Sequence, residues 1–441
     1  MRNIARGSRV CSSRPDAGPT STPNGGPLST LSPARTRLAL LALALGGFGI
    51  GTTEFVAMGL LPQIAQNLEP GLWAADQDGA ISRAGILISA YALGVVVGAP
   101  TIAAFAARFE RKAVLIWLGI AFTLGTIASS LAPSFESVVA FRFIAGLPHG
   151  AYFGIAALVA AGLLGPEQRG RAVAFVLSGL TVANVVGVPI ITWVGQHSTW
   201  RVAYLLVAAI FAGATAAIAL TVPRHPGDRH ATMRRELGAF KRPAVWFALL
   251  TGALGFGGFF AVYSYVAPLV TEVAGATESV VPIALVSLGV GMTVGNVIGG
   301  RVADSGALRA VFIMFGALAA SLFVLALLAR SLPGLLAGVV LVGASAAALS
   351  PAIQTRLMDV AGDAQTMAAA VNRSALNLGN SLGAFLGGAA IAAGWGYLAP
   401  TWIGLALCVP GVLFALGGWA VTRRTSDAVV THGGVERVGA L

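Results

Sequence analysis

The chain has 441 residues and a formal net charge of +11, yet 56% of its residues are hydrophobic and only 10% are charged. Soluble domains carry roughly 25% charged residues, so this composition excludes an ordinary soluble protein. The hydrophobic residues form runs of about 19 to 27, and such a run crosses a hydrocarbon core of about 30 Å as a helix. Because helices satisfy their own backbone groups in lipid, we predict an all-α integral membrane protein.

In chain order, the apolar runs predict twelve transmembrane spans, which are separated by turn residues such as LAPS at 131–134. The predicted spans are residues 38–61, 84–106, 113–131, 137–163, 172–194, 202–222, 244–269, 281–300, 310–328, 335–358, 368–392 and 401–421. Residues 1–35 are rich in Ser, Thr, Pro, Gly and Arg and lack the apolar core of a signal peptide. They predict a disordered cytoplasmic tail, or a start codon assigned too far upstream.

The 28 Lys and Arg residues predict the orientation. With the N-terminus inside the cell, 23 of them lie in cytoplasmic segments, counting Arg356 at the cytoplasmic end of its span. Three lie in outer loops (Arg83, Arg201, Arg330) and two deeper within spans (Arg142, Arg373). This is a strong positive-inside bias. We therefore expect a multi-pass protein of the inner (cytoplasmic) membrane with both termini in the cytoplasm. The bias also explains the net charge, so we expect no nucleic acid partner.

The spans divide into two related halves. The predicted units are an N-terminal half at 36–222, a basic cytoplasmic linker at 223–243, a C-terminal half at 244–422 and a cytoplasmic tail at 423–441. At an offset of 206, residues of the first span recur in the seventh: Gly46, Gly49, Gly51, Val56 and Pro62 correspond to Gly252, Gly255, Gly257, Val262 and Pro268. At an offset of 197, Gly94, Val97 and Gly98 correspond to Gly291, Val294 and Gly295. Two parallel repeats of six helices are one plan of transporters, with the substrate site near the midplane.

Three short motifs suggest a family. RFIAGLPHG at 142–150 places Gly146 four residues after Arg142, GGRVAD at 299–304 precedes Arg309, and GLTVANVVGVP spans 179–189. They resemble, in that order, the fourth-span motif, the loop motif between spans eight and nine, and the fifth-span antiporter motif of the major facilitator superfamily. GTTEF, LISAYALGVVVGAP and NLGNSLGAFLGG resemble the twelve-span drug:proton antiporters, within them the arabinose-efflux-like and chloramphenicol-efflux-like permeases.

The resemblance implies a fold of twelve helices in two pseudo-repeats, with spans 1, 4, 7 and 10 around a cavity. It also implies a set of residues that control the conformational change: Arg111, Lys112, Gly146, Gly187, Pro189, Gly300, Asp304 and Arg309. The sequence departs from the motifs at two places. Ala107 stands where the loop between spans two and three would carry aspartate, and the fifth-span motif reads Gly-Val-Pro rather than Gly-Pro.

Glu54 is the only one of the 17 acidic residues that lies within a predicted span. An ionised group there costs a few kcal/mol or more. At about 1.5 Å per residue, Glu54 and Arg142 lie at a similar depth, roughly 8 to 10 Å below the outer surface. Burial disfavours an ionised carboxylate and a nearby cation favours it, so Glu54 can change protonation as a cavity opens to each side in turn. We predict that Glu54 and Arg142 couple transport to protons. The alternatives are that Glu54 handles a cationic substrate, or that the two residues form a constitutive ion pair between spans 1 and 4.

Other side chains within the spans are candidates for contact with a substrate. They are His149, Asn184, Phe260, Tyr263, Asn377 and Asn380. Arg373, Asn377 and Asn380 form one stripe at i, i+4 and i+7. Structural roles are the alternatives: interhelical hydrogen bonds for the polar residues, packing for the aromatic ones, and snorkelling to the cytoplasmic surface for Arg373. Spans 3, 6, 9 and 12 carry no charged residue and are predicted to face lipid.

The sequence shows no phosphate-binding loop with its lysine, no metal-ligand spacing, and no serine and carboxylate to accompany His149. We therefore expect no cofactor, no metal and no enzymatic activity. The prediction is a monomeric secondary transporter, surrounded by lipid, that exports small organic molecules or drugs in exchange for protons. An exporter of a native metabolite such as a sugar or nucleoside is the alternative on the same fold, and a non-transporting membrane sensor is a different class.

Overall fold

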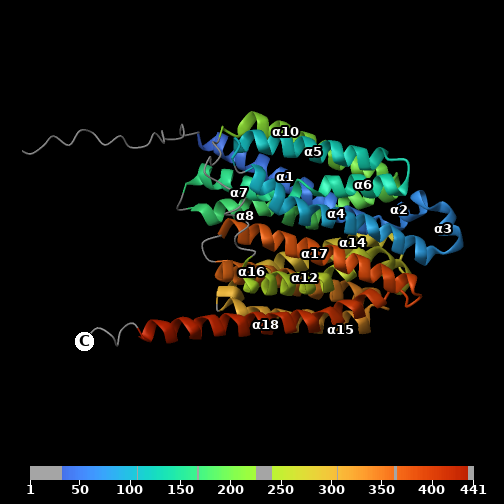
Figure 1. Ribbon diagram of the computed structural model, residues 1–441. Helices are drawn as coiled ribbons and strands as arrows, with labels where there is room; N and C mark the ends of the chain where they lie inside the picture. Colours follow the sequence, from blue (N-terminus) through green and yellow to red (C-terminus); the bar gives the residue numbers. More distant parts are fainter. Residues whose placement is uncertain are drawn as a thin grey trace, which may run out of the picture.

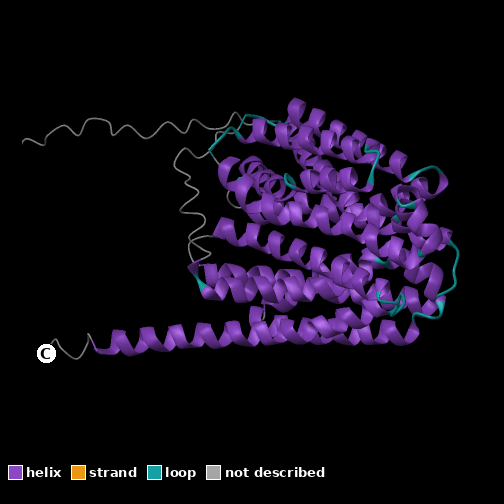
Figure 2. Cartoon of the chain, turned by 45° about the vertical axis from the view of Figure 1, so that its right-hand side comes forward, coloured by secondary structure: helices purple, strands orange, loops and turns teal. Residues whose placement is uncertain are grey.

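The computed structural model describes residues 32–106, 108–165, 168–224, 241–304, 306–361 and 365–435. Every regular element in these ranges is a helix (Figure 2). Twelve helical segments of the described chain are long and apolar enough to cross a membrane, which confirms the predicted span count. The short loops between them leave most backbone groups bonded within helices, as lipid requires.

The N-terminal half contains the first six spans. Its helices are α1 (Pro33–Gly59), α2 (Leu61–Leu68), α3 (Pro70–Ala75), α4 (Gln77–Ala106), α5 (Arg111–Leu131), α6 (Phe135–Gly146), α7 (His149–Leu164), α8 (Arg169–Val182), η2 (Ala183–Gly187), α9 (Val188–His197) and α10 (Trp200–Thr221). Span 4 consists of α6 and α7, and span 5 of α8, η2 and α9. Because α1 begins at Pro33, the first helix already starts within the segment predicted as a tail.

The C-terminal half contains the other six spans. Its helices are α12 (Pro243–Ser264), α13 (Val266–Pro268), η4 (Leu269–Val273), η5 (Glu278–Val280), α14 (Val281–Asp304), α15 (Ala307–Leu328), α16 (Leu332–Ala361), α17 (Gln365–Ala392) and α18 (Ala399–Val435). The last helix continues to Val435, beyond the predicted end of span 12 at residue 421.

The two halves lie side by side, and the start of α1 and the end of α18 lie at the same end of the bundle (Figure 1). Backbone geometry supports the internal repeat. The first helix of each half stops at a residue with nearly the same dihedral angles, Leu60 (φ −113°, ψ 13°) and Tyr265 (φ −116°, ψ 25°), and a shorter helix follows. At the offset of 206 Leu60 corresponds to Val266, so the correspondence between spans 1 and 7 holds for these breaks to within one residue.

Span 5 contains a turn of π-helix, and its cause is local. Proline has no backbone N–H, so Pro189 cannot donate to the carbonyl oxygen four residues before it. The helix widens over Ala183–Gly187, where the N–H of Val188 bonds to the carbonyl of Ala183. A Cβ atom on Gly187 would lie only 2.7 Å from Phe48 and from Thr52 of α1, so the glycine is required by the close approach of spans 1 and 5.

Helices of the two halves pack directly along the seam between them. The main pairs are α4 with α17, and α14 with η2 and α9, which join span 2 to span 11 and span 5 to span 8. At the second pair, a Cβ atom on Gly289 would lie 2.6 Å from the backbone oxygen of Asn184. Such near-backbone contact between small residues is typical of membrane helices, where van der Waals packing contributes much of the association.

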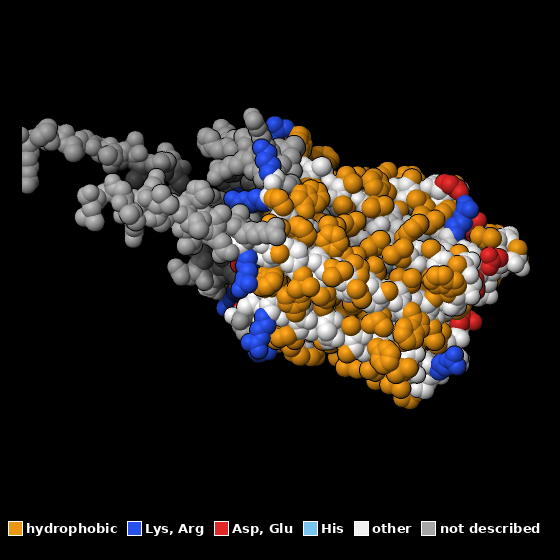
Figure 3. Space-filling view, turned by 60° about the horizontal axis from the view of Figure 1, so that its bottom comes forward, with side chains coloured by type: hydrophobic (Ala, Val, Ile, Leu, Met, Phe, Trp, Pro, Cys, Tyr) orange, Lys and Arg blue, Asp and Glu red, His pale blue; other side chains and the backbone are white. Residues whose placement is uncertain are grey.

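The outer surface of the bundle matches a membrane environment. Hydrophobic side chains cover the middle of the face in Figure 3, and Lys and Arg gather at the end where the described chain begins and ends, which we call the basic end. Most acidic side chains of that face lie at the other end, which we call the acidic end. Spans 3, 6, 9 and 12 pack mainly within their own halves and expose large apolar residues such as Trp117, Leu220 and Leu413.

At the acidic end, side-chain hydrogen bonds join the two halves. Gln63 of α2 donates to the Glu278 carboxylate at 2.9 Å, and Gln196 of α9 donates to the Glu278 carbonyl at 3.0 Å. The Tyr397 hydroxyl, from the loop between α17 and α18, donates to Asp78 of α4 at 2.5 Å. Residues 49–61 and 255–270 of the two central helices are all buried next to this end. The halves are thus closed on each other at the acidic end.

Candidate functional site

Glu54 lies at the seam between the halves. Its side chain on α1 is only 5% exposed, and its Oε1 atom accepts a hydrogen bond of 3.3 Å from the Asn380 amide on α17. This bond joins residues 326 positions apart, one from each half. A buried carboxylate stabilised by a donor from the opposite half is sensitive to any relative motion of the halves.

Arg142 of α6 is buried beside Glu54 but does not form an ion pair with it. Its Nη1 atom donates to the backbone oxygen of Thr53 at 3.1 Å, and its guanidinium lies 4.2 Å from the ring centre of Tyr91. Its Nε and Nη2 atoms are buried and have no hydrogen-bond partner among the described residues. The two residues predicted to pair are therefore adjacent in this conformation, with the arginine held at the neighbouring residue.

His149 is the first residue of α7, directly after the break at Leu147 and Pro148. Its Nδ1 atom lies 3.2 Å from the hydroxyl of Tyr91, the same tyrosine whose ring faces Arg142. Both groups are 1% exposed. Tyr91 thus connects two predicted site residues, although the sequence pattern did not single it out. A lone tyrosine in the small-residue stretch SAYALG was the available signal.

Arg373 of α17 reaches across the seam to the other half. Its guanidinium lies 4.7 Å from the ring centre of Phe153 on α7, in the other half. Its side chain is only half-buried. In this conformation Arg373 therefore packs across the seam on an aromatic ring of the other half.

Two asparagines extend the stripe of Arg373. The Asn377 amide donates to the Arg373 carbonyl at 3.1 Å, and the Asn380 amide donates to Glu54. The Oδ1 atoms of both asparagines are buried and accept no hydrogen bond within the described part of the chain. Unpaired buried acceptors cost free energy, so these two oxygens are available to a bound molecule or to water.

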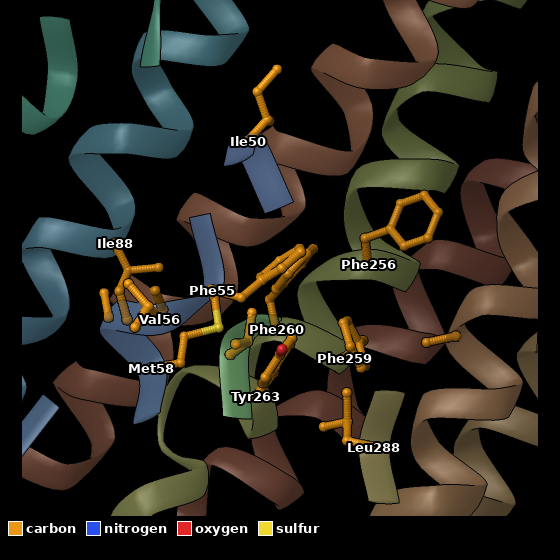
Figure 4. Packing of buried hydrophobic residues seen from close by; sticks show 14 of the residues in the cluster. Ile50, Phe55, Val56, Met58, Ile88, Phe256, Phe259, Phe260, Tyr263 and Leu288 are labelled. Carbon is orange, nitrogen blue, oxygen red and sulfur yellow. The ribbon is translucent and has the colours of Figure 1, made fainter. Parts of the chain in front are cut away.

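An aromatic cluster closes the seam on the acidic side of Glu54. Phe55 of α1 stacks on Tyr263 and Phe260 of α12, with ring centres 5.2 and 6.2 Å apart (Figure 4). The Tyr263 hydroxyl donates to the Asn184 side chain at 3.5 Å, again across the seam. The predicted residues Asn184, Phe260 and Tyr263 therefore lie together, while Phe55 completes the cluster and was not predicted.

The residues expected to control the conformational change occupy separate places. Gly146 is required by packing, because its Cβ atom would lie 2.2 Å from the backbone oxygen of Tyr91, whereas Gly300 faces open space. Arg111 and Lys112 begin α5 at the basic end. Asp304 and Arg309 are both exposed and form no ion pair with each other. Ala107 lies outside the described residues.

Sequence comparison assigns the family. Residues 43–305 and 266–436 match the family model described as Major Facilitator Superfamily. The chain belongs to the Major Facilitator Superfamily. It is 40% identical over 361 residues to the inner membrane transport protein YdhP of Escherichia coli K12, which covers 81% of this chain and 90% of that protein. It is 33% identical over 399 residues to the chloramphenicol resistance protein of Streptomyces lividans, covering 90% of this chain and all of that protein.

Solved structures agree on the fold. The inward-facing, occupied structure of a bacterial homologue of the human lysosomal transporter Spinster superposes with a TM-score of 0.70 at 17% identity, covering 89% of this chain and 98% of that one. The D-xylose-proton symporter gives a TM-score of 0.69 at 19% identity, with coverages of 87% and 97%. Family and fold together make this chain a membrane transporter of the superfamily and not an enzyme.

Proposed function

We propose that this superfamily member exports small organic molecules or drugs across the cytoplasmic membrane in exchange for protons, by alternating access. The observation that carries the proposal is the position of Glu54. It is buried at the seam, and its hydrogen-bond donor Asn380 belongs to the other half. Glu54 would be the proton-coupling group.

Alternating access supplies the physical reason. When the halves rock against each other, the contact between α1 and α17 must change, and Glu54 loses or regains the Asn380 donor and the nearby charge of Arg373. Both of these stabilise the ionised carboxylate. A change of conformation therefore changes the proton affinity of Glu54, and by reciprocity its protonation biases the conformation. An exchanger needs this linkage.

The relatives support export and the class of substrate. The Streptomyces lividans relative is a chloramphenicol resistance protein, which favours outward transport of a small organic molecule. Protons as the coupling ion rest on Glu54 itself and on the antiporter-like motifs in the sequence. We further propose that the protein acts as a monomer with both termini in the cytoplasm, so that the basic end faces inward and the acidic end outward.

The test is transport in proteoliposomes with an imposed pH gradient, using chloramphenicol, sugars and nucleosides as the panel. Wild-type protein should accumulate at least one compound, and Glu54→Gln should bind that compound but fail to concentrate it. Glu136→Gln is the matched control, because it makes the same change at an exposed carboxylate. Full gradient-driven transport by Glu54→Gln would refute the proposed role of Glu54.

A native metabolite is the second candidate substrate. The unpaired oxygens of Asn377 and Asn380 suit the hydroxyl donors of a sugar or nucleoside. A relative 24% identical over 348 residues is a probable sugar efflux transporter of Pasteurella multocida. Transport of a sugar or nucleoside but not of chloramphenicol in the same panel would favour this candidate. A purely sensory protein would transport nothing in the panel.

A further inference from the structure

The charged side chains along the seam are unbalanced. Arg142 and Arg373 provide two positive charges, whereas Glu54 is the single acidic side chain among the described residues of the seam interior. His149, the remaining titratable base there, is buried against Tyr91. The region is therefore positive even when Glu54 is ionised, and it becomes more positive when Glu54 takes up a proton.

Arg373 lies between Glu54 and the basic end. Seven residues separate it from Asn380, so at about 1.5 Å per residue it lies roughly 10 Å nearer that end than the donor of Glu54. Within the described chain, its guanidinium has no hydrogen bond or ion pair, and the face of Phe153 is its partner. A molecule that approached Glu54 from the basic end along α17 would therefore come close to this half-buried cation.

The polar atoms left unpaired suit an uncharged molecule. Arg142 offers two buried donor nitrogens, Nε and Nη2, without acceptors, and Asn377 and Asn380 offer oxygens without donors. Hydroxyl, carbonyl and amide groups complement such a set, and the ring of Phe153 provides an apolar surface beside it. An organic cation would instead meet two arginines and gain only one carboxylate.

We propose that Arg373 is a specificity-determining residue that excludes organic cations, so that the site accepts uncharged molecules with hydrogen-bonding groups. This inference rests on the proposed function for its transport consequence. Exchange of one uncharged molecule for one proton moves one positive charge across the membrane in each cycle. The exchange is therefore electrogenic, and a membrane potential alone drives it.

The expected effect follows from Coulomb's law. A unit charge about 8 Å from a bound monocation, at an effective dielectric constant of about 20, changes the affinity by roughly 30-fold. Removing the charge of Arg373 should therefore admit cations while an uncharged ligand of the same shape is affected far less. The contrast between a charged and an uncharged probe separates exclusion by charge from a general loss of packing.

The binding test compares two probes of similar shape, triphenylphosphine oxide and the methyltriphenylphosphonium cation, by quenching of tryptophan fluorescence. Wild-type protein should bind the oxide at least about tenfold more tightly. The affinity of Arg373→Gln for the cation should be at least about tenfold higher than that of wild type, and its affinity for the oxide should change little. Arg373→Lys keeps the charge and should keep the wild-type preference, and Arg330→Gln, which removes an arginine of an outer loop, should change nothing.

Equal affinity of wild type for both probes would overturn the inference, as would binding of neither probe. An unchanged preference in Arg373→Gln would do the same. The wild-type comparison decides the matter if Arg373→Gln does not fold. These measurements need no proton gradient, so they stand apart from the proposed coupling.

A transport experiment separates the two proposals directly. Radiolabelled chloramphenicol serves as the uncharged probe in proteoliposomes with equal pH on both sides and an inside-positive potential set by potassium and valinomycin. We expect this potential alone to drive accumulation. Accumulation driven by a pH gradient but insensitive to potential would overturn the electrogenic inference and leave proton exchange intact. Failure of both gradients would refute proton-coupled exchange itself.

Discussion

The hydrogen bond between Tyr397 and Asp78 gives a quantitative prediction about the closed acidic end. The bond is 2.5 Å long and joins a loop of the C-terminal half to α4 of the N-terminal half. Hydrogen bonds to charged groups contribute about 1.5–3 kcal/mol. If the bond breaks when the halves separate at this end, Tyr397→Phe should raise the equilibrium constant for opening by roughly 10- to 150-fold.

The pKa of the Tyr397 hydroxyl is raised by burial first and then by the hydrogen bond to Asp78. A raised pKa means that the contribution of the protonated phenol is fully present below the ordinary tyrosine value near 10 and is lost as the pH rises from there through the raised value. The closed acidic end should therefore persist into the alkaline range, and the effect of Tyr397→Phe should be the same at pH 6 and pH 9.

Spin labels at Gln66 and Thr277 measure the opening, because these exposed residues lie at the acidic end in opposite halves. Distance distributions from pulsed electron resonance should show a longer component that grows in Tyr397→Phe. Tyr152→Phe is the control, since its hydroxyl bonds to Leu43 within one half. The reasoning fails if Tyr397→Phe leaves the distribution unchanged, or if the control produces the same shift.

Three further predictions concern packing and topology. Leu115 is fully buried and Leu124 is 61% exposed on the same helix. Leu115→Ala should therefore lower the free energy of unfolding in detergent by about 2–5 kcal/mol, and Leu124→Ala should lower it much less. Equal losses in thermal melts would contradict the lipid-facing assignment of that side of α5. A Cβ atom on Gly98 would clash with the backbone oxygen of Leu147, whereas a Cβ atom on Gly154 would meet open space. Gly98→Ala should therefore reduce the yield of folded protein measured by gel filtration, and Gly154→Ala should not. Single cysteines at Asp76 and within residues 223–243 should react with impermeant reagents from opposite sides of sealed cells, and labelling of both from outside would refute the proposed orientation.

The fold was predictable because it depends on signals that are local in the sequence. Apolar runs of sufficient length must become helices in lipid, whatever their partners, so the span count needed no tertiary information. The glycines and prolines of the loops predicted most span boundaries to within a few residues of the helix ends in the structure. The helix ends at Pro33 and Val435 were missed because helices can continue into polar segments once a membrane span has nucleated them.

The candidate site was only partly predictable, because its contacts join distant parts of the chain. The cost of burying a charge singled out Glu54 in the sequence. Its hydrogen-bond partner Asn380 lies 326 residues away and could be proposed only as one of several polar residues. The partner of Arg373 was not predictable at all. Whether a long cationic side chain snorkels or turns inward depends on what the opposite half presents, here the ring of Phe153.

The internal repeat explains why the halves differ where they meet. Glu54 and Phe260 are equivalent positions in the repeat, and Phe260 packs against Phe55, the residue next to Glu54. Equivalent residues near the axis of a two-fold repeat face one another, so a carboxylate at both positions would bring two like charges together in a medium of low polarity. Such charges repel strongly when buried. An aromatic ring at the second position instead covers the neighbourhood of the single carboxylate. Under the proposed mechanism, that carboxylate exchanges its proton without a second acidic group titrating beside it.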